Sequence, residues 1–152
     1  MIYRKSRAVM LGVAAVLALS FAPTHQAFAD NCGNGDFHGN YGFSFSGTRI
    51  DGTNPGPRVG AGLLFFDGNG NFHGVVTKSK NGVIETDIPL TGTYTMNTAV
   101  SPINLTCTGS ATFANENAEF RSFQFVLVNN HKGFVGVQTD AGRATSIHGT
   151  RE

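Results

Sequence analysis

Clusters of turn-forming residues interrupt this 152-residue chain at short intervals, and their spacing is the feature that most restricts its fold. Gly and Asn dominate these clusters, and both residue types accept the positive φ angles that tight hairpin turns require. Only short segments are left between neighbouring clusters, which favours strands over helices. The clusters lie at positions 31–35, 51–56, 67–71, 81–82, 115–117, 129–130 and 140–142.

Several segments between the turns alternate apolar and polar residues with a period of two, as half-buried strands do. Segments 58–66, 72–79, 133–139 and 143–150 alternate less cleanly, so their inner and outer faces stay open. Tyr41, Phe43 and Phe45 alternate with glycine and serine. Segments 84–96 and 105–113 repeat the pattern, which places Ile84 on an inner face. About eight strands with short connections predict an all-β fold. We expect a single antiparallel closed β-barrel with meander topology, and a two-sheet β-sandwich is the alternative.

The first 29 residues have the composition of a secretory signal peptide. Arg4, Lys5 and Arg7 precede a small, apolar run at residues 8–19, and Ala27-Phe28-Ala29 matches a signal-peptidase site. A run of 12 residues is shorter than the roughly 20 that a membrane-spanning helix needs. We therefore predict a cleaved signal at 1–29 and one domain at 30–152. The protein would be exported to the periplasm or outside the cell, with no membrane span after cleavage.

Removal of the signal changes the charge balance of the chain. Three of the 11 Lys and Arg residues lie in the signal, so eight basic and 10 acidic residues remain, for a formal charge of −2. The eight basic residues are scattered along the sequence and form no stripe that could neutralise phosphates. The sequence therefore predicts no nucleic-acid partner.

Cys32 and Cys107 are the only two cysteines. In an oxidising compartment an even number of cysteines often forms disulfides, so we predict a Cys32–Cys107 bridge. The alternative is a free Cys107 thiol on the inner face of its strand, where an apolar environment would raise its pKa and make it unreactive. Neither state favours covalent catalysis.

Several motifs stand out along the chain: Gly39-Asn-Tyr41-Gly-Phe43, residues 59–63, 66–71, 91–97 and 107–113, and Thr139-Asp-Ala-Gly142. Together they resemble a family of uncharacterised small secreted bacterial proteins, which is grouped with the allene oxide cyclase-like β-barrels. The resemblance implies an eight-stranded, calycin-like barrel of the kind shared with dirigent proteins and several bacterial cyclases. Because its motifs consist of turn and strand residues, it implies a fold and carries over no catalytic position.

No residue pattern in the chain predicts a catalytic, metal or cofactor site. Glu85 and Asp87 are two apart, but the polar strand face that carries them should point to solvent. Residues 67–71 place oxygen ligands at alternate positions, as a calcium loop does, but Phe72 and Lys78 occupy positions that need glycine and a carboxylate. The histidines show no metal-ligand spacing. The catalytic residues stay unknown, and we predict no metal and no cofactor.

The inward aromatic residues are the best candidates for a ligand site. An eight-stranded barrel is just wide enough to be filled by its own side chains or to hold one small ligand, and both possibilities stay open here. The first function we consider is a binding protein for a small apolar ligand or a partner. The alternatives are a cofactor-free cyclase or isomerase that acts by shape, and a structural or surface-interaction module. The candidate lumen residues are Tyr41, Phe43, Phe45, Tyr94, Phe123 and Phe125.

Overall fold

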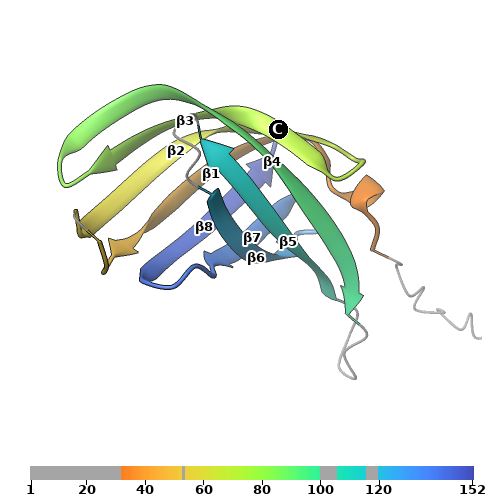
Figure 1. Cartoon of the computed structure of the whole chain (residues 1–152). Helices are drawn as coiled ribbons and strands as arrows, with labels where there is room; N and C mark the ends of the chain where they lie inside the picture. The colour runs from red at the N-terminus through yellow and green to blue at the C-terminus, as the bar shows by residue number, and fades with distance from the viewer. Residues whose placement is uncertain (1–31, 53, 100–105, 116–119) are drawn as a thin grey trace, which may run out of the picture.

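Eight antiparallel strands form one closed barrel in the computed structural model, in which each strand pairs with the next and β8 returns to β1 (Figure 1). The barrel confirms the predicted all-β fold and excludes the sandwich. The structure describes residues 32–52, 54–99, 106–115 and 120–152, so the predicted signal peptide lies outside the described residues. The elements are the 3₁₀ helix η1 (Asn34–Asp36) and the strands β1 (His38–Arg49), β2 (Gly56–Asp67), β3 (Asn71–Lys80), β4 (Val83–Ala99), β5 (Thr106–Asn115), β6 (Phe120–Val128), β7 (Gly133–Gln138) and β8 (Arg143–Arg151).

The period-two alternation decides which residues enter the barrel. Tyr41 and Phe43 of β1 are 0% and 7% exposed, and Phe123, Phe125 and Leu127 of β6 are buried as well. Residues between them on the same strands are exposed or half-buried. The core of the molecule is therefore the lumen of the barrel, which is filled mainly by aromatic side chains.

Glycine opposite an aromatic residue lets these large rings fit inside a narrow barrel. Phe72 lies opposite Gly92 in the register of β3 and β4, and a Cβ at Gly92 would collide with the Phe72 ring. Phe125 of β6 lies opposite Gly109 of β5 in the same way. Each ring thus lies over the backbone of the neighbouring strand, an arrangement that also shields the glycine from water.

A β-bulge in β4 alters the predicted faces of this strand. Val76 pairs with Ile88 and Lys78 with Glu85, so residues 86–87 of β4 lie opposite one residue of β3, and Asp87 has a φ of 54°. The extra residue reverses the alternation. Ile84 is 68% exposed, so the prediction that it faces inward is wrong.

The same bulge separates the two carboxylates that the sequence places on one solvent-facing strand face. Glu85 lies opposite Lys78 in the β3–β4 register and shares its strand face. The Glu85 carboxylate is 3.1 Å from the Lys78 ammonium group. Pro89 itself pairs in register with Val75. The distortion precedes the proline by two residues.

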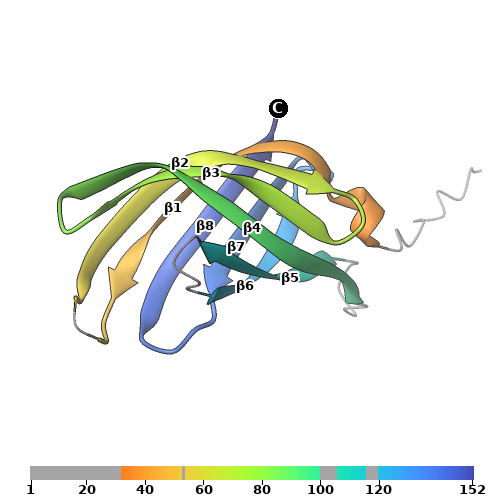
Figure 2. The same ribbon diagram turned by 45° about the horizontal axis from the view of Figure 1, so that its top comes forward.

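The barrel has two distinct ends. Figures 1 and 2 show η1 against one end, while the β3–β4 hairpin projects from the opposite end. We call the first the plugged end, which includes η1, Phe37 and Cys32, and the second the open end, where β1, β3 and β7 finish and β2 and β8 begin. No helix among the described residues is long and apolar enough to cross a membrane.

Candidate functional site

Phe37 closes the plugged end of the barrel. It is 1% exposed, and its ring centroid lies 3.9 Å from that of Phe66, 4.9 Å from Tyr41 and 5.2 Å from Phe125. The sequence analysis did not identify this residue, because Phe37 precedes β1 and belongs to no alternating segment. The only signal available was an isolated aromatic residue directly after a polar, glycine-rich turn.

Two tyrosine hydroxyls tie the plug to the barrel wall. Tyr94 donates a hydrogen bond to the Phe37 carbonyl oxygen at 2.7 Å, and the Asn34 carbonyl lies at 3.0 Å as an alternative acceptor. Tyr41 donates to the His131 carbonyl at 2.9 Å. Burial raises the pKa of both phenols, with a smaller opposing effect of Arg151 at Tyr41. Both hydroxyls are therefore neutral donors with structural partners.

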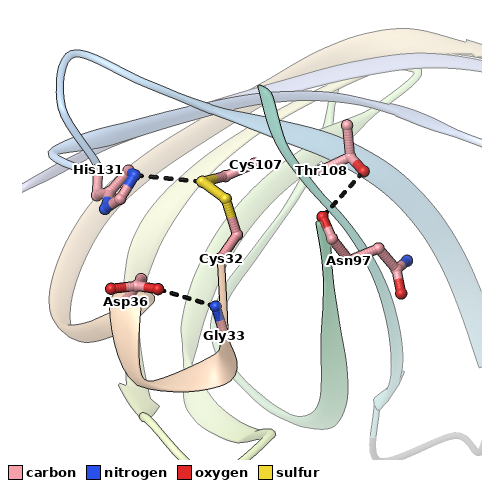
Figure 3. The surroundings of a disulfide bond; sticks show 7 residues. All are labelled: Cys32, Gly33, Asp36, Asn97, Cys107, Thr108 and His131. Carbon is pink, nitrogen blue, oxygen red and sulfur yellow. Dashed lines mark hydrogen bonds between the residues drawn. A yellow bond between two sulfur atoms is a disulfide. The ribbon is translucent and has the colours of Figure 1, made fainter. Parts of the chain in front are cut away.

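A disulfide fixes the plug covalently (Figure 3). Cys32 and Cys107 are bonded across 75 residues of sequence, with their Cα atoms 5.4 Å apart, which confirms the predicted bridge. Both residues are buried, and His131 Nε2 lies 3.2 Å from Cys107 Sγ. These are also the only three His, Cys, Asp or Glu residues in the described part of the chain whose ligand atoms cluster within 4.8 Å. The disulfide engages both sulfurs, so neither is a free thiolate in this structure.

A cavity of about 120 Å³ opens from the lumen toward the open end of the barrel. Phe37 and Phe66 form part of its deep surface, and Ala111 and Ile147 line its sides. Four of the predicted lumen residues, Phe43, Phe45, Phe123 and Phe125, line this cavity. Tyr41 and Tyr94 do not, because they pack around Phe37 at the plugged end. The lumen is thus filled at one end and hollow toward the other.

Basic side chains gather at the open end of the barrel. Arg58, Lys78 and Arg121 line the cavity. Lys80 lies opposite Arg58 in the β2–β3 register, and Arg49 lies opposite Arg143 in the β1–β8 register. Six of the eight basic residues of the predicted domain are therefore at this end, although they are scattered in the sequence. Strand order brings them together, which the sequence analysis did not foresee.

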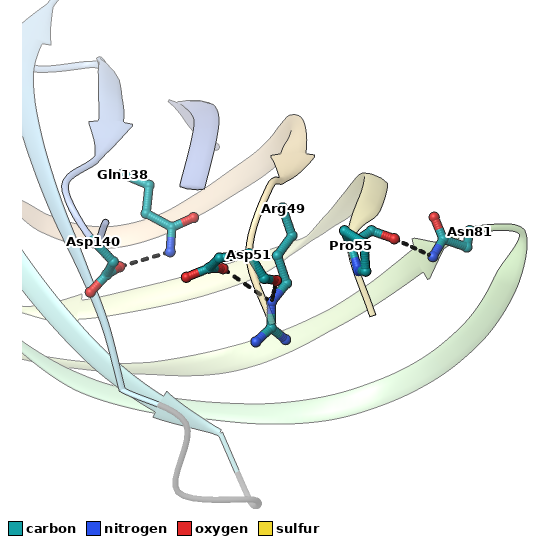
Figure 4. A network of polar contacts seen from close by, with 6 residues as sticks. All are labelled: Arg49, Asp51, Pro55, Asn81, Gln138 and Asp140. Atoms are coloured by element: carbon teal, nitrogen blue, oxygen red, sulfur yellow. Dashed lines mark hydrogen bonds and ion pairs between the residues drawn. The ribbon is translucent and has the colours of Figure 1, made fainter. Parts of the chain in front are cut away.

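Part of this charge is balanced by neighbouring acidic groups (Figure 4). Arg49 Nε donates to the Asp51 carbonyl at 2.8 Å and lies 3.5 Å from the Asp51 carboxylate. Asp140 lies at the same end, but it accepts its hydrogen bonds from neutral groups, Gln138 Nε2 at 2.7 Å and the Ser122 amide at 3.0 Å. Lys78 pairs with Glu85.

One uncharged polar side chain that lines the cavity, Thr145, has a hydroxyl without a hydrogen-bond partner among the described residues. Thr145 is only 6% exposed, and its Oγ1 has no hydrogen-bond partner among the residues that the structure describes. A buried hydroxyl of this kind destabilises the empty protein by about 1–3 kcal/mol. It is available to a polar group that enters the cavity.

The turn that resembles a calcium loop in composition uses its carboxylate internally. Asp67 Oδ1 accepts hydrogen bonds from the Asn69 amide at 2.7 Å and the Asn71 amide at 2.9 Å, and Oδ2 accepts from Asn71 Nδ2 at 2.8 Å. The hydrogen bond from the Asn71 side chain is the largest of the effects that lower the pKa of Asp67. The segment is a β2–β3 hairpin turn, as its sequence suggests.

The outer wall of the barrel carries several exposed apolar side chains on β2 and β3. Leu63, Phe65 and Val75 are 38%, 39% and 46% exposed, and Leu63 lies opposite Val75 in the strand register. With His73 and Asn40 they surround a shallow hollow. The surface-interaction module considered from the sequence stays a prediction.

Comparisons with known proteins leave the family open. A scan against models of protein families, a search of curated protein sequences and a search of solved structures each found no match to this chain. The allene oxide cyclase-like resemblance therefore stays a prediction. The barrel itself is observed directly.

Proposed function

We propose that this protein is an exported binding protein that takes one small apolar ligand into its barrel through the open end. The observation that carries the proposal is the cavity itself, because it is walled mainly by Phe, Leu, Ile and Val side chains and opens between polar ones. Concave, mostly apolar sites with a few polar groups are typical of small-molecule binding.

The size of the cavity limits the ligand. An engineered cavity of about 150 Å³ with apolar walls binds benzene, and the cavity here measures about 120 Å³. The ligand would therefore place one ring, or a short alkyl chain, inside the barrel. Any larger part would extend through the mouth.

The same comparison bears on the alternative function. A cyclase that folds its substrate by shape must enclose the reacting part of that substrate, and complete ligand pockets usually measure about 300–1,000 Å³. The smaller cavity here favours binding over such an activity.

Export is part of the proposal. It is supported by the disulfide, which is typical of oxidising compartments, and by the signal-like composition of residues 1–29. The oxidised protein is accordingly the form to test.

Toluene is a suitable first probe, because it is neutral and has a single ring. We expect saturable shifts of amide NMR signals from cavity-lining residues when toluene is added to the oxidised protein. Ala111→Leu would fill the cavity and weaken toluene binding by at least about tenfold, which corresponds to about 1.4 kcal/mol. Ala111 lines the cavity on β5.

Ala61→Leu is the matched control, because Ala61 is exposed on β2 and the substitution adds the same three carbon atoms outside the barrel. It should leave toluene binding unchanged. The absence of saturable shifts in the unmodified protein would contradict the proposal. Equal weakening by the two substitutions would contradict it as well.

A further inference from the structure

We infer that the ligand is an amphiphile with an anionic head group, which Arg58 and Arg121 hold at the mouth while the apolar body occupies the cavity. This inference rests on the proposed function and specifies the chemical class of its ligand.

Arg58 and Arg121 line the cavity from opposite walls of the barrel. Arg58 belongs to β2 and Arg121 to β6, strands that lie on opposite sides of an eight-stranded ring. Both are half-buried and line the cavity. Two guanidinium groups thus approach the same opening from opposite walls.

The guanidinium group of arginine is well suited to bind an anionic head group. Its planar, forked donors match the oxygen atoms of carboxylate, sulfate and phosphate groups, and it keeps its charge at any physiological pH. An anionic head at the opening would interact with them while the rest of the molecule lies against phenylalanine rings.

Thr145 is an independent observation that points to the same position. Its buried hydroxyl lines the cavity from β8 and lacks a hydrogen-bond partner within the described parts of the chain. An oxygen atom of an anionic head group would accept a hydrogen bond from it. Such a bond would remove the cost of a buried, unsatisfied hydroxyl.

The basic residues at the open end are consistent with an anionic head group there. The predicted domain has a formal charge of −2, and six of its eight basic residues lie at the open end. Asp51, Glu85, Asp87 and Asp140 lie at the same end, where Asp51 pairs with Arg49 and Glu85 with Lys78. Basic side chains that line one cleft attract anions to it and raise their rate of association. Arg58 and Arg121, which line the cavity, thus favour an anion over a neutral ligand of the same shape.

The test compares octanoate and octyl sulfate with 1-octanol, which has the same chain and a neutral head. Binding to the oxidised protein is measured by NMR titration at constant ionic strength. We expect octanoate or octyl sulfate to bind at least about tenfold more tightly than 1-octanol. The ratio between the two anions distinguishes a planar carboxylate from a tetrahedral head group.

Substitutions then locate the head group. Arg58→Met and Arg121→Met should each weaken binding of the preferred anion about tenfold, with little change for 1-octanol. Lys132→Met is the matched control, because Lys132 is an exposed basic residue in the β6–β7 connection at the plugged end. It should change neither affinity.

The outcomes separate the inference from the proposed function. If 1-octanol binds as tightly as both anions, the anionic head group is disproved while the apolar site stands. If neither the anions nor the neutral probes bind, the proposed function fails. The comparison of ligands uses the unmodified protein, so it decides the question even if an arginine variant does not fold.

Discussion

The plugged end and the open end of the barrel differ in how their buried polar groups are satisfied. At the plugged end, the hydroxyls of Tyr41 and Tyr94 donate to backbone carbonyls, and the side chain of Asn34 accepts from the Met96 amide at 2.8 Å. At the open end, the buried Thr145 hydroxyl has no partner among the described residues, and a cavity adjoins it. The buried polar groups named at the plugged end are thus satisfied by the chain's own atoms, while the open end has a buried hydroxyl beside a cavity.

The largest loss of stability is expected when the Phe37 ring is removed from the plugged end. Phe37→Ala should lower the free energy of unfolding by up to about 5 kcal/mol, because a fully buried ring is lost from a cluster of aromatic neighbours. Urea unfolding of the oxidised protein measures the loss. Phe65→Ala is the control, since Phe65 is 39% exposed on the outer wall, and it should cost far less. Similar losses in the two variants would contradict a special role for Phe37.

The disulfide gives the next largest effect. Replacing Cys32 and Cys107 together by alanine should cost about 4 kcal/mol on the chain-entropy model, because the bridge closes a loop of 75 residues in the unfolded chain. Toluene affinity should change little, since the bridge lies at the plugged end. A variant that unfolds at the same urea concentration as the unmodified protein would refute this expectation.

Tyr94→Phe tests a single satisfied hydroxyl. We expect a loss of about 1–3 kcal/mol, because a buried hydrogen bond to the Phe37 carbonyl disappears. The pH dependence gives a second measurement. Burial raises the pKa of Tyr94 above its value of 10.0 in the unfolded chain, so its contribution is complete below pH 10 and is lost as pH rises through the folded-state pKa.

Between pH 10 and pH 11, the unmodified protein should therefore lose stability more steeply than Tyr94→Phe. Tyr41 has a raised pKa for the same reason, so part of the slope should persist in the variant. Identical slopes would show that the Tyr94 proton does not contribute.

Thr145→Val should have the smallest effect and the opposite sign. Valine has nearly the same shape as threonine and removes a buried hydroxyl that lacks a partner, so the empty protein should gain about 1 kcal/mol. Thr150→Val on the exposed face of β8 is the control and should stay within about 0.5 kcal/mol of the unmodified protein. A loss of stability in Thr145→Val would indicate that the hydroxyl is already satisfied.

The fold was largely predictable from the sequence, because about half of the strands alternate clearly and each turn carries its own glycine or asparagine. The faces of segments 58–66, 72–79, 133–139 and 143–150 could not be assigned in this way. Tyr41 and Phe123 were placed inside the barrel on this basis alone, and both are buried. Ile84 was misplaced because a single bulge at residues 86–87 reverses the alternation. The nearby Pro89 is typical of bulges but does not mark the exact position of this one.

The candidate site was predictable only in part. The aromatic lining follows from strand periodicity, but the basic mouth does not. Arg58 and Arg121 are 63 positions apart, and only the order and register of the strands bring them to one opening. Phe37 was missed for a related reason, since its role depends on the path of the chain before β1.

The pairing of β1 with β8 has a consequence for how the chain reaches its folded state. Tyr41 lies opposite Arg151, so the last seam of the barrel joins residues that are 110 positions apart. Contacts between such distant segments slow folding, because the intervening chain must be ordered before the contact forms. Until β8 arrives, β1 presents an open strand edge, which is a site for pairing with other chains. Prompt closure of the β1–β8 seam therefore limits the time during which this edge can pair with other chains.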